Sequence, residues 1–238
     1  MRLMKSSVMV VMGIITAATL GGCAGSYQAR SVDLKQATLV NPDLLKKGEG
    51  DQLLYRYVNP KADVKQYTSM LIEPVLVTKD GELDKDDLLA YQTLANNAYV
   101  YLNKELGKDF KLVTVPEPGV MRIQMAITDA DSSKPVRNTL STFVPIGMGL
   151  SLIKYTAVGK QSGVGEITVE MRITDATTGE LLGAALDRRV GGKDITTLWS
   201  SWANADAALE YWAQRLRFVL CDMRGGGTTC VKPGEEKK

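Results

Sequence analysis

The chain has 238 residues, 45% of them hydrophobic and 24% charged, which is typical of a folded globular protein and too apolar for a disordered one. Its formal net charge is +2, and two of its basic residues precede Cys23 in a stretch that contains no acidic residue. The rest of the chain is therefore close to neutral, which argues against a nucleic-acid partner.

Histidine is absent from the chain. Its absence removes the commonest general base, the commonest metal ligand and every nucleophile that a histidine activates. Carboxylate chemistry is still available. We therefore expect a non-enzymatic protein with no catalytic residue, no cofactor and no metal.

The first residues have the features of a secretory signal peptide. Arg2 and Lys5 precede the uncharged run VMVVMGIITAATL over residues 8–20, which is too short to cross a membrane. The sequence LGGC that ends at Cys23 resembles the bacterial lipobox, in which a branched apolar residue and two small residues precede a cysteine. The resemblance implies cleavage before Cys23 and acylation of this residue, which would anchor the chain to a lipid bilayer. The alternative is an ordinary signal peptide with an incidental cysteine.

The residue after Cys23 is Ala24 rather than aspartate. In lipoproteins of Gram-negative bacteria, aspartate at this place commonly keeps the protein in the inner membrane. The resemblance therefore implies an outer-membrane lipoprotein whose body faces the periplasm. The polar residues 23–51 predict a flexible tether, and turn signals within residues 53–67 predict an irregular segment laid on the domain.

The next residues predict strands on either side of a helix. The run SMLIEPVLV over residues 69–77 predicts a strand with an edge or a bulge at Pro74. Apolar residues at helical spacing predict a helix between an N-cap at Asp84 and a C-cap at Gly107. The run KLVTV over residues 111–115 predicts a second strand.

The second half of the chain shows the strongest periodicity. Strict alternation over residues 120–128 and 165–174 predicts two strands with one face on the core and one toward water, antiparallel to their neighbours. A turn in which Gly179 can take a positive φ connects to a fifth strand over residues 181–190. An apolar stripe at helical spacing, which includes the three tryptophans, predicts a core helix over residues 194–220.

Cys221 and Cys230 are separated by DMRGGGTT, whose glycines let the chain double back. The pair can therefore meet the geometry of a disulfide, which an exported protein would keep. A metal site and two free thiols are the alternatives.

The order of these elements predicts an α/β (α+β) fold, a two-layer sandwich with a mixed, mainly antiparallel sheet of about five strands and two main helices on one face. We expect a lipoprotein signal peptide over residues 1–22, a lipidated flexible tether over 23–51, a periplasmic domain over 52–224, and a C-terminal tail with the disulfide loop over 225–238.

Three stretches of the sequence resemble one protein family. They are LLYRYVNPKADVKQYTSMLIEPV, PGVMRIQMAITDA and VGEITVEMRITDATTGELLGAALDRRVG. They resemble an uncharacterised family of Gram-negative lipoproteins, a domain of unknown function numbered 3313, over about residues 53–224. The resemblance implies a location and a fold, and it implies no chemistry.

The polar face of the predicted sheet is one candidate surface. It carries Arg122, Gln124, Glu170 and Arg172, joined by Arg188 or by Asp187 and Arg189 according to the strand register. This face predicts either a pocket for an anionic envelope component or a solvated surface with cross-strand ion pairs. Four acidic residues near turns are candidates for catalytic carboxylates, cation ligands or turn caps: Asp129, Asp131, Asp175 and Glu180.

The segment over residues 139–163 is a second candidate surface because it is long, apolar and rich in glycine. It includes Phe143, Ile146 and Leu150. It predicts a contact with the membrane or with an envelope protein partner, or else a cover for the open sheet face.

The sequence favours a binding or scaffolding component of the envelope. Two alternatives are a carboxylate-dependent enzyme on an envelope polymer and a carrier of an apolar ligand beneath the loop from Phe143 to Val158.

Overall fold

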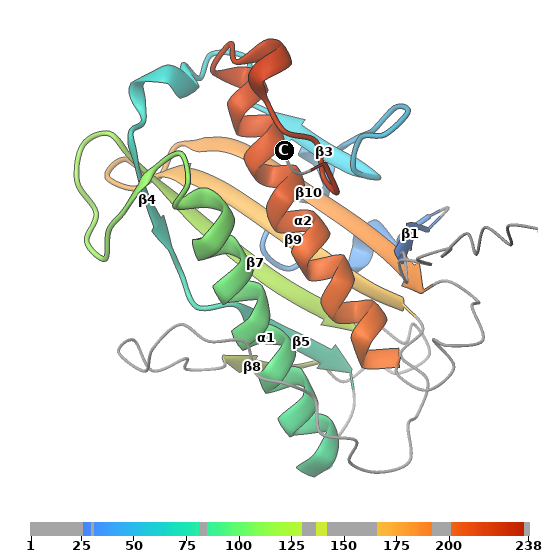
Figure 1. Ribbon diagram of the computed structural model, residues 1–238. Coiled ribbons are helices and arrows are strands. Elements are labelled where there is room, and N and C mark those ends of the chain that lie inside the picture. The colour runs from blue at the N-terminus through green and yellow to red at the C-terminus, as the bar shows by residue number, and fades with distance from the viewer. Residues whose placement is uncertain are drawn as a thin grey trace, which may run out of the picture.

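A two-layer arrangement of one sheet and two long helices forms the fold in the computed structural model (Figure 1). The structure describes residues 26–29, 31–80, 85–129, 137–141, 166–191 and 201–235. The predicted signal peptide, Cys23, Asp131, and the loop residues Phe143, Ile146 and Leu150 lie outside the described residues.

Three long strands form the centre of the sheet. They are β7 (Val120–Asp129), β9 (Glu166–Asp175) and β10 (Leu181–Gly191), and β9 is antiparallel to both of its neighbours. A turn with Gly179 at φ 74° joins β9 to β10, so the predicted hairpin is confirmed.

The predicted strand over residues 69–77 is divided at Pro74. Strands β4 (Ser69–Ile72) and β5 (Leu76–Asp80) lie one after the other along the same edge of β7. Proline has no N–H to donate to a neighbouring strand, so the pairing stops there and resumes at Leu76.

The pairing of β7 with β4 and β5 is parallel. The prediction that β7 is antiparallel to its neighbours is therefore wrong on this side. The helix between β5 and β7 explains the difference, because a crossover helix returns the chain to the end of the sheet from which it left.

The sheet has ten strands in the described part of the chain, where the sequence predicts about five. Its main path runs β2-β3-β10-β9-β7-β4-β6, with β1 on β10 and β8 on β5. The strands not predicted are short and lie toward the edges of the sheet: β1 (Ser26–Gln28), β2 (Lys46–Lys47), β3 (Tyr55–Val58) and β8 (Arg137–Ser141). The predicted strand over 111–115 appears as β6 (Lys111–Leu112). Strands of two to five residues are too short to show a clear alternation.

The helices α1 (Lys85–Leu106) and α2 (Ser201–Met223) cover one face of the sheet, as predicted (Figure 1). The main core lies between these helices and the alternate residues of β7 and β9, which include Ile123, Ile127 and Val169. Trp212 of α2 is fully buried in this core, which confirms its interpretation as a core residue. Neither helix has the length and hydrophobicity that a membrane span requires, and the same holds for every helix in the described residues.

Residues 31–54 form a segment that we call the N-terminal cover, and most of it packs on the opposite face of the sheet. The short helical turns η1 (Leu34–Gln36) and η2 (Pro42–Leu44) shape this segment. Its apolar side chains Val32, Val40, Leu45 and Leu54 form a second core with Ala184 and Leu186 of β10. The flexible tether predicted over residues 23–51 is therefore wrong for residues 31–51, and the segment predicted as irregular contains β3 and the helical turn η3 (Val64–Gln66).

Candidate functional site

The strand register decides which charged residues share the face of the sheet that lies away from the helices. Arg188 pairs with Thr168 and Leu186 pairs with Glu170, so Arg188 belongs to the face of Glu170. Asp187 and Arg189 therefore face the helices. Of the two alternatives that the sequence left open, the structure selects Arg188.

Glu170 lies beneath the N-terminal cover and is fully buried, with 0% of its surface exposed. Its carboxylate accepts hydrogen bonds from the backbone N–H groups of Thr38 and Leu39, both at 2.7 Å. It also accepts from the hydroxyls of Thr38 and Thr128, both at 3.2 Å. This carboxylate fastens the cover to the sheet and is not open to a ligand.

The other charged residues of this face lie apart from Glu170. Arg122 is 3.3 Å from a carboxylate oxygen of Glu73, and Gln124 donates to the other oxygen at 2.9 Å. Arg188 forms an ion pair with Glu166 at the start of β9. Arg172 has no side-chain partner within the described residues. The structure thus places cross-strand pairs on this face, and a role in binding an anion or a partner stays a prediction.

Arg189 points to the helices and its guanidinium lies over the ring of Tyr211, 3.7 Å from the centroid. Burial lowers the pKa of Arg189, an effect that Tyr211 and Asp187 oppose. A buried cation held between an aromatic face and a carboxylate is a packing element of the interior.

The acidic residues of the hairpin turn form hydrogen bonds that hold the fold. Asp175 accepts hydrogen bonds from Thr177 N at 2.9 Å, Thr178 N at 2.8 Å and the Tyr67 hydroxyl at 3.0 Å. Glu180 accepts from the side-chain amide of Asn59, outside the turn, at 2.9 Å. The turn-cap interpretation therefore holds for Asp175 and not for Glu180. The side chains of Asp129 and Asp131 lie outside the described residues.

Hydrogen bonds from Thr178 and Thr177 hold the pKa of Asp175 well below its usual range. A carboxyl group whose pKa is lower in the folded state stabilises the fold above its unfolded pKa of about 3.9, and this contribution is lost as the pH falls further. We expect Asp175→Asn to lower stability by about 2 kcal/mol at pH 7. Urea unfolding between pH 7 and pH 2 should show a smaller loss of stability below pH 4 in the variant. Equal pH dependence in both proteins would contradict this account.

Asp187 is the centre of a second buried network, on the helix side of β10, with 1% of its surface exposed. One oxygen accepts from Leu54 N at 3.0 Å and from the Gln28 side chain at 2.9 Å. The other accepts from the indole N–H of Trp212 at 2.7 Å. This carboxylate joins β1, the end of the N-terminal cover and α2 through β10.

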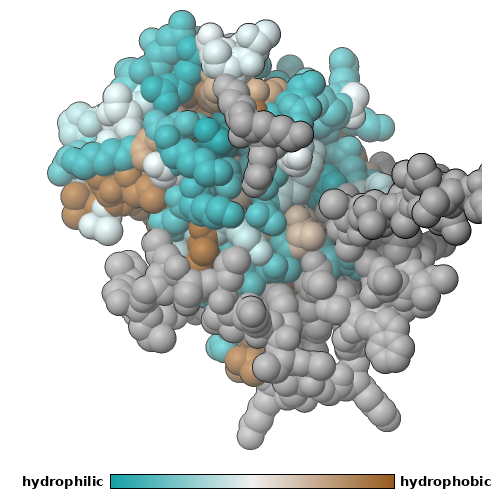
Figure 2. All heavy atoms as spheres, viewed as in Figure 1, coloured by the Kyte–Doolittle hydropathy of each residue, from teal (hydrophilic) through white to brown (hydrophobic). Residues whose placement is uncertain are grey.

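A cavity of about 100 Å³ lies beside Trp212, between the C-terminal half of α2 and the strands β3, β9 and β10. Its lining is mainly apolar and includes Val58, Met171, Ile173, Ala185, Leu216 and Val219. The described surface over the two helices is mainly hydrophilic, with small separate hydrophobic areas (Figure 2). The cavity is therefore an apolar hollow that the described residues offer to a ligand.

Two arginines are among the residues that line this apolar cavity, Arg56 on β3 and Arg215 on α2. Arg215 is 3.1 Å from a carboxylate oxygen of Asp51, and its buried Nε has no hydrogen-bond partner among the described residues. Sequence reasoning missed both residues. Arg215 could have been found from the sequence, because it lies at helical spacing from Trp212 and Val219 and is a charged residue on their apolar stripe.

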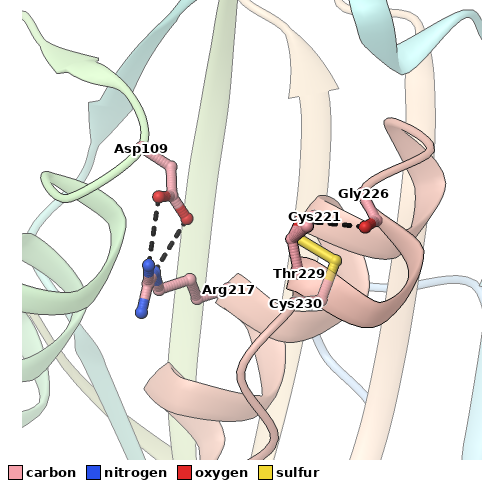
Figure 3. Close-up of a disulfide and its surroundings, with 6 residues drawn as sticks. All are labelled: Asp109, Arg217, Cys221, Gly226, Thr229 and Cys230. Carbon is pink, nitrogen blue, oxygen red and sulfur yellow. Dashed lines mark hydrogen bonds and ion pairs between the residues drawn. A yellow bond between two sulfur atoms is a disulfide. The ribbon is translucent and has the colours of Figure 1, made fainter. Parts of the chain in front are cut away.

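The end of α2 is fixed by a disulfide between Cys221 and Cys230, which confirms the predicted pair (Figure 3). The bond closes a loop with the helical turn η5 (Gly227–Thr229). One turn earlier on α2, Arg217 forms two hydrogen bonds with Asp109, at 2.7 and 3.1 Å. These contacts hold the C-terminal half of α2, which forms one wall of the cavity. No cluster of three or more acidic or cysteine side chains that could hold a metal occurs within the described ranges.

A family model described as "Protein of unknown function (DUF3313)" matches residues 35–216. No curated protein matches the chain. Among solved structures, the chain is similar to the PelC dodecamer from Paraburkholderia phytofirmans, with a TM-score of 0.33, 11% identity, and coverage of 65% of this chain and 89% of that chain. It is also similar to a DUF4136 family protein from Bacteroides thetaiotaomicron, with a TM-score of 0.35, 12% identity, and coverage of 68% and 95%.

Proposed function

Since the chain belongs to the DUF3313 family of proteins of unknown function, we propose its function from its own residues: it is an outer-membrane lipoprotein whose periplasmic domain binds or scaffolds other envelope components without catalysis. The proposal that the domain is not catalytic is supported by the hydrogen bonds of two buried carboxylates. Glu170 accepts four hydrogen bonds and Asp187 accepts three, all from groups that hold the fold together. A carboxylate enzyme needs such groups open to a substrate in a pocket.

The position of β1 supports an anchor close to the domain. Ser26 pairs with Gly191 at the end of β10, and Glu166 at the start of β9 pairs with Val190. Only residues 24 and 25 separate Cys23 from Ser26. A lipid on Cys23 would therefore hold this end of the sheet near the bilayer. The apolar segment that precedes Glu166 would then meet the membrane or a membrane-bound partner.

A second candidate is a carrier of an apolar ligand, which the cavity beside Trp212 favours. The sequence placed such a ligand beneath the loop of Phe143, whereas the described cavity lies under α2. The two candidates are compatible, because an anchored domain can bind a ligand away from the anchor.

We expect Cys23→Ser to release the protein from the membrane, because acyl chains on this residue supply its attachment. Fractionation of cells into soluble and outer-membrane parts, with labelled palmitate to detect acylation, is the measurement. The double variant Cys221→Ser/Cys230→Ser is the matched control and should keep both the label and the membrane location. A Cys23→Ser protein that stays in the membrane after its leader is removed would exclude the lipid anchor.

A further inference from the structure

We infer that the cavity under α2 binds a single aliphatic chain that carries an anionic group, either a carboxylate or a phosphate. The aliphatic chain occupies the apolar interior, and the anion pairs with the guanidinium groups of Arg215 and Arg56. The inference rests on the proposed binding role of the domain, and it does not depend on the anchor.

The walls of the cavity favour an aliphatic ligand. Val58, Ala185, Val219 and Met223 line it and stay partly exposed, whereas a continuous core would bury such side chains. A cavity of about 150 Å³ holds a benzene molecule. On this scale the volume of about 100 Å³ holds about four carbon atoms. The end of an aliphatic chain matches this space and gains free energy by leaving water.

The surroundings of Arg215 favour an anionic group on the ligand. Only 8% of its side chain is exposed, and its one described carboxylate partner, Asp51, is 75% exposed. A buried cation whose counter-charge lies mostly in water is poorly compensated. An anion at the mouth of the cavity would bring a second negative charge to this guanidinium.

Arg56 adds a second positive charge to the lining, and its side chain has no ion-pair partner among the described residues. Two carboxylates are also close. Asp187 lines the cavity but already accepts three hydrogen bonds, and Asp51 is exposed enough to turn toward water when an anion arrives. The unused groups at the site are thus donors, which selects an anionic ligand over a cationic or neutral one.

The test uses the full acylated chain in nanodiscs of phosphatidylcholine, because a detergent would compete for the cavity. Equilibrium dialysis with labelled octanoate, octyl phosphate and octanol gives the three dissociation constants after subtraction of empty nanodiscs. The three probes share one chain length and differ in the head group. Comparison of octanoate with octyl phosphate distinguishes a fatty acid from a phosphorylated lipid as the source of the ligand.

We expect at least one anionic probe to bind about tenfold or more tightly than octanol. Arg215→Met should remove this preference and leave the affinity for octanol nearly unchanged. Val219→Trp should fill the cavity and weaken all three probes, and Met223→Trp serves the same purpose if the first variant does not fold. Arg217→Met is the matched control, because this residue is on the same helix but pairs with Asp109 outside the cavity.

Equal affinity of the wild type for octanol and both anions would overturn the inference while leaving the apolar carrier in place. Unchanged binding in both tryptophan variants would place the ligand elsewhere and overturn it as well. Neither result bears on the anchor, which the release of Cys23→Ser tests separately.

Discussion

Replacement of Glu170 by alanine is expected to lower the free energy of unfolding by about 3–4 kcal/mol. The substitution removes the acceptor of the Thr38 and Leu39 N–H groups and leaves a gap under the N-terminal cover. An unsatisfied polar group at a buried position costs about 1–3 kcal/mol, and the lost packing adds to this.

The loss should be concentrated in the N-terminal cover, because the apolar contacts of Val32 and Val40 with Leu186 depend on the position that Glu170 fixes. Hydrogen exchange of the Thr38 and Leu39 amides should accelerate more than that of amides in β7. Urea unfolding followed by circular dichroism gives the size of the total effect.

Two variants separate this role from a general effect of charge. Glu170→Gln keeps one oxygen for the two backbone donors, and its amide can donate to the threonine hydroxyls, so the expected loss is about 1 kcal/mol. Glu166→Ala removes a carboxylate from the same strand, where it forms a surface ion pair with Arg188, and should cost less than about 1 kcal/mol. A loss in Glu170→Ala no larger than in Glu166→Ala would contradict the structural role.

The long elements of the fold could be predicted because each presents one regular face to the core. In β7, Ile123 and Ile127 alternate with polar residues, and β9 shows the same pattern at Val169 and Ile173. Helix α1 was predictable for the same reason, since its apolar residues recur at helical spacing. Regular burial leaves a regular pattern in the sequence.

The N-terminal cover has no such pattern. Its buried residues Val32, Val40 and Leu45 are spaced irregularly among polar residues, as in a flexible segment. Their burial depends on partners such as Leu186 and Glu170, which lie more than 100 positions further along the chain. The local signals that did exist were the N-caps Asp33 and Asn41, whose side chains accept from the backbone two residues on.

Alternation in β7 also could not reveal the direction of its partners, since parallel and antiparallel neighbours both bury one face of a strand. A rule of connection could have done so, because a helix between two strands of one sheet makes them parallel. The cavity was even harder to predict from the sequence, because it forms where α2, β3 and β10 meet. Arg215 on an apolar helical stripe was the one local sign of it.

Asp187→Ala is expected to destabilise the protein by about 3–5 kcal/mol, because three donors from three parts of the chain lose their common acceptor at once. The removal of this carboxylate also takes away a negative charge that stabilises the buried cation of Arg189. Asp222→Ala changes an exposed carboxylate on α2 and should have an effect of less than about 0.5 kcal/mol.

A double-mutant cycle can assign part of this loss to the contact with Trp212. Asp187→Asn places an amide donor against the indole N–H, so two donors face each other and the expected cost is about 2 kcal/mol. Trp212→Phe removes the indole donor and, with it, the conflict. The double variant Asp187→Asn/Trp212→Phe should therefore be more stable than the sum of the single effects predicts. Strict additivity in urea unfolding would show that the contact carries no coupling energy.

The carboxylate of Asp187 also links the N-terminal strand β1, the end nearest the proposed anchor, to the core of the domain. Gln28 of β1 lies five positions after Cys23, and its side chain reaches Asp187, which in turn binds Trp212 in the core. In the proposed lipoprotein, the lipid-bearing end of the chain is thus connected to the interior by two hydrogen bonds as well as by the pairing of β1. We expect Asp187→Ala to accelerate hydrogen exchange at Tyr27 and Gln28 more than in the centre of β9. Equal protection of the β1 amides from hydrogen exchange in the variant and the wild type would show that strand pairing alone holds this end of the domain.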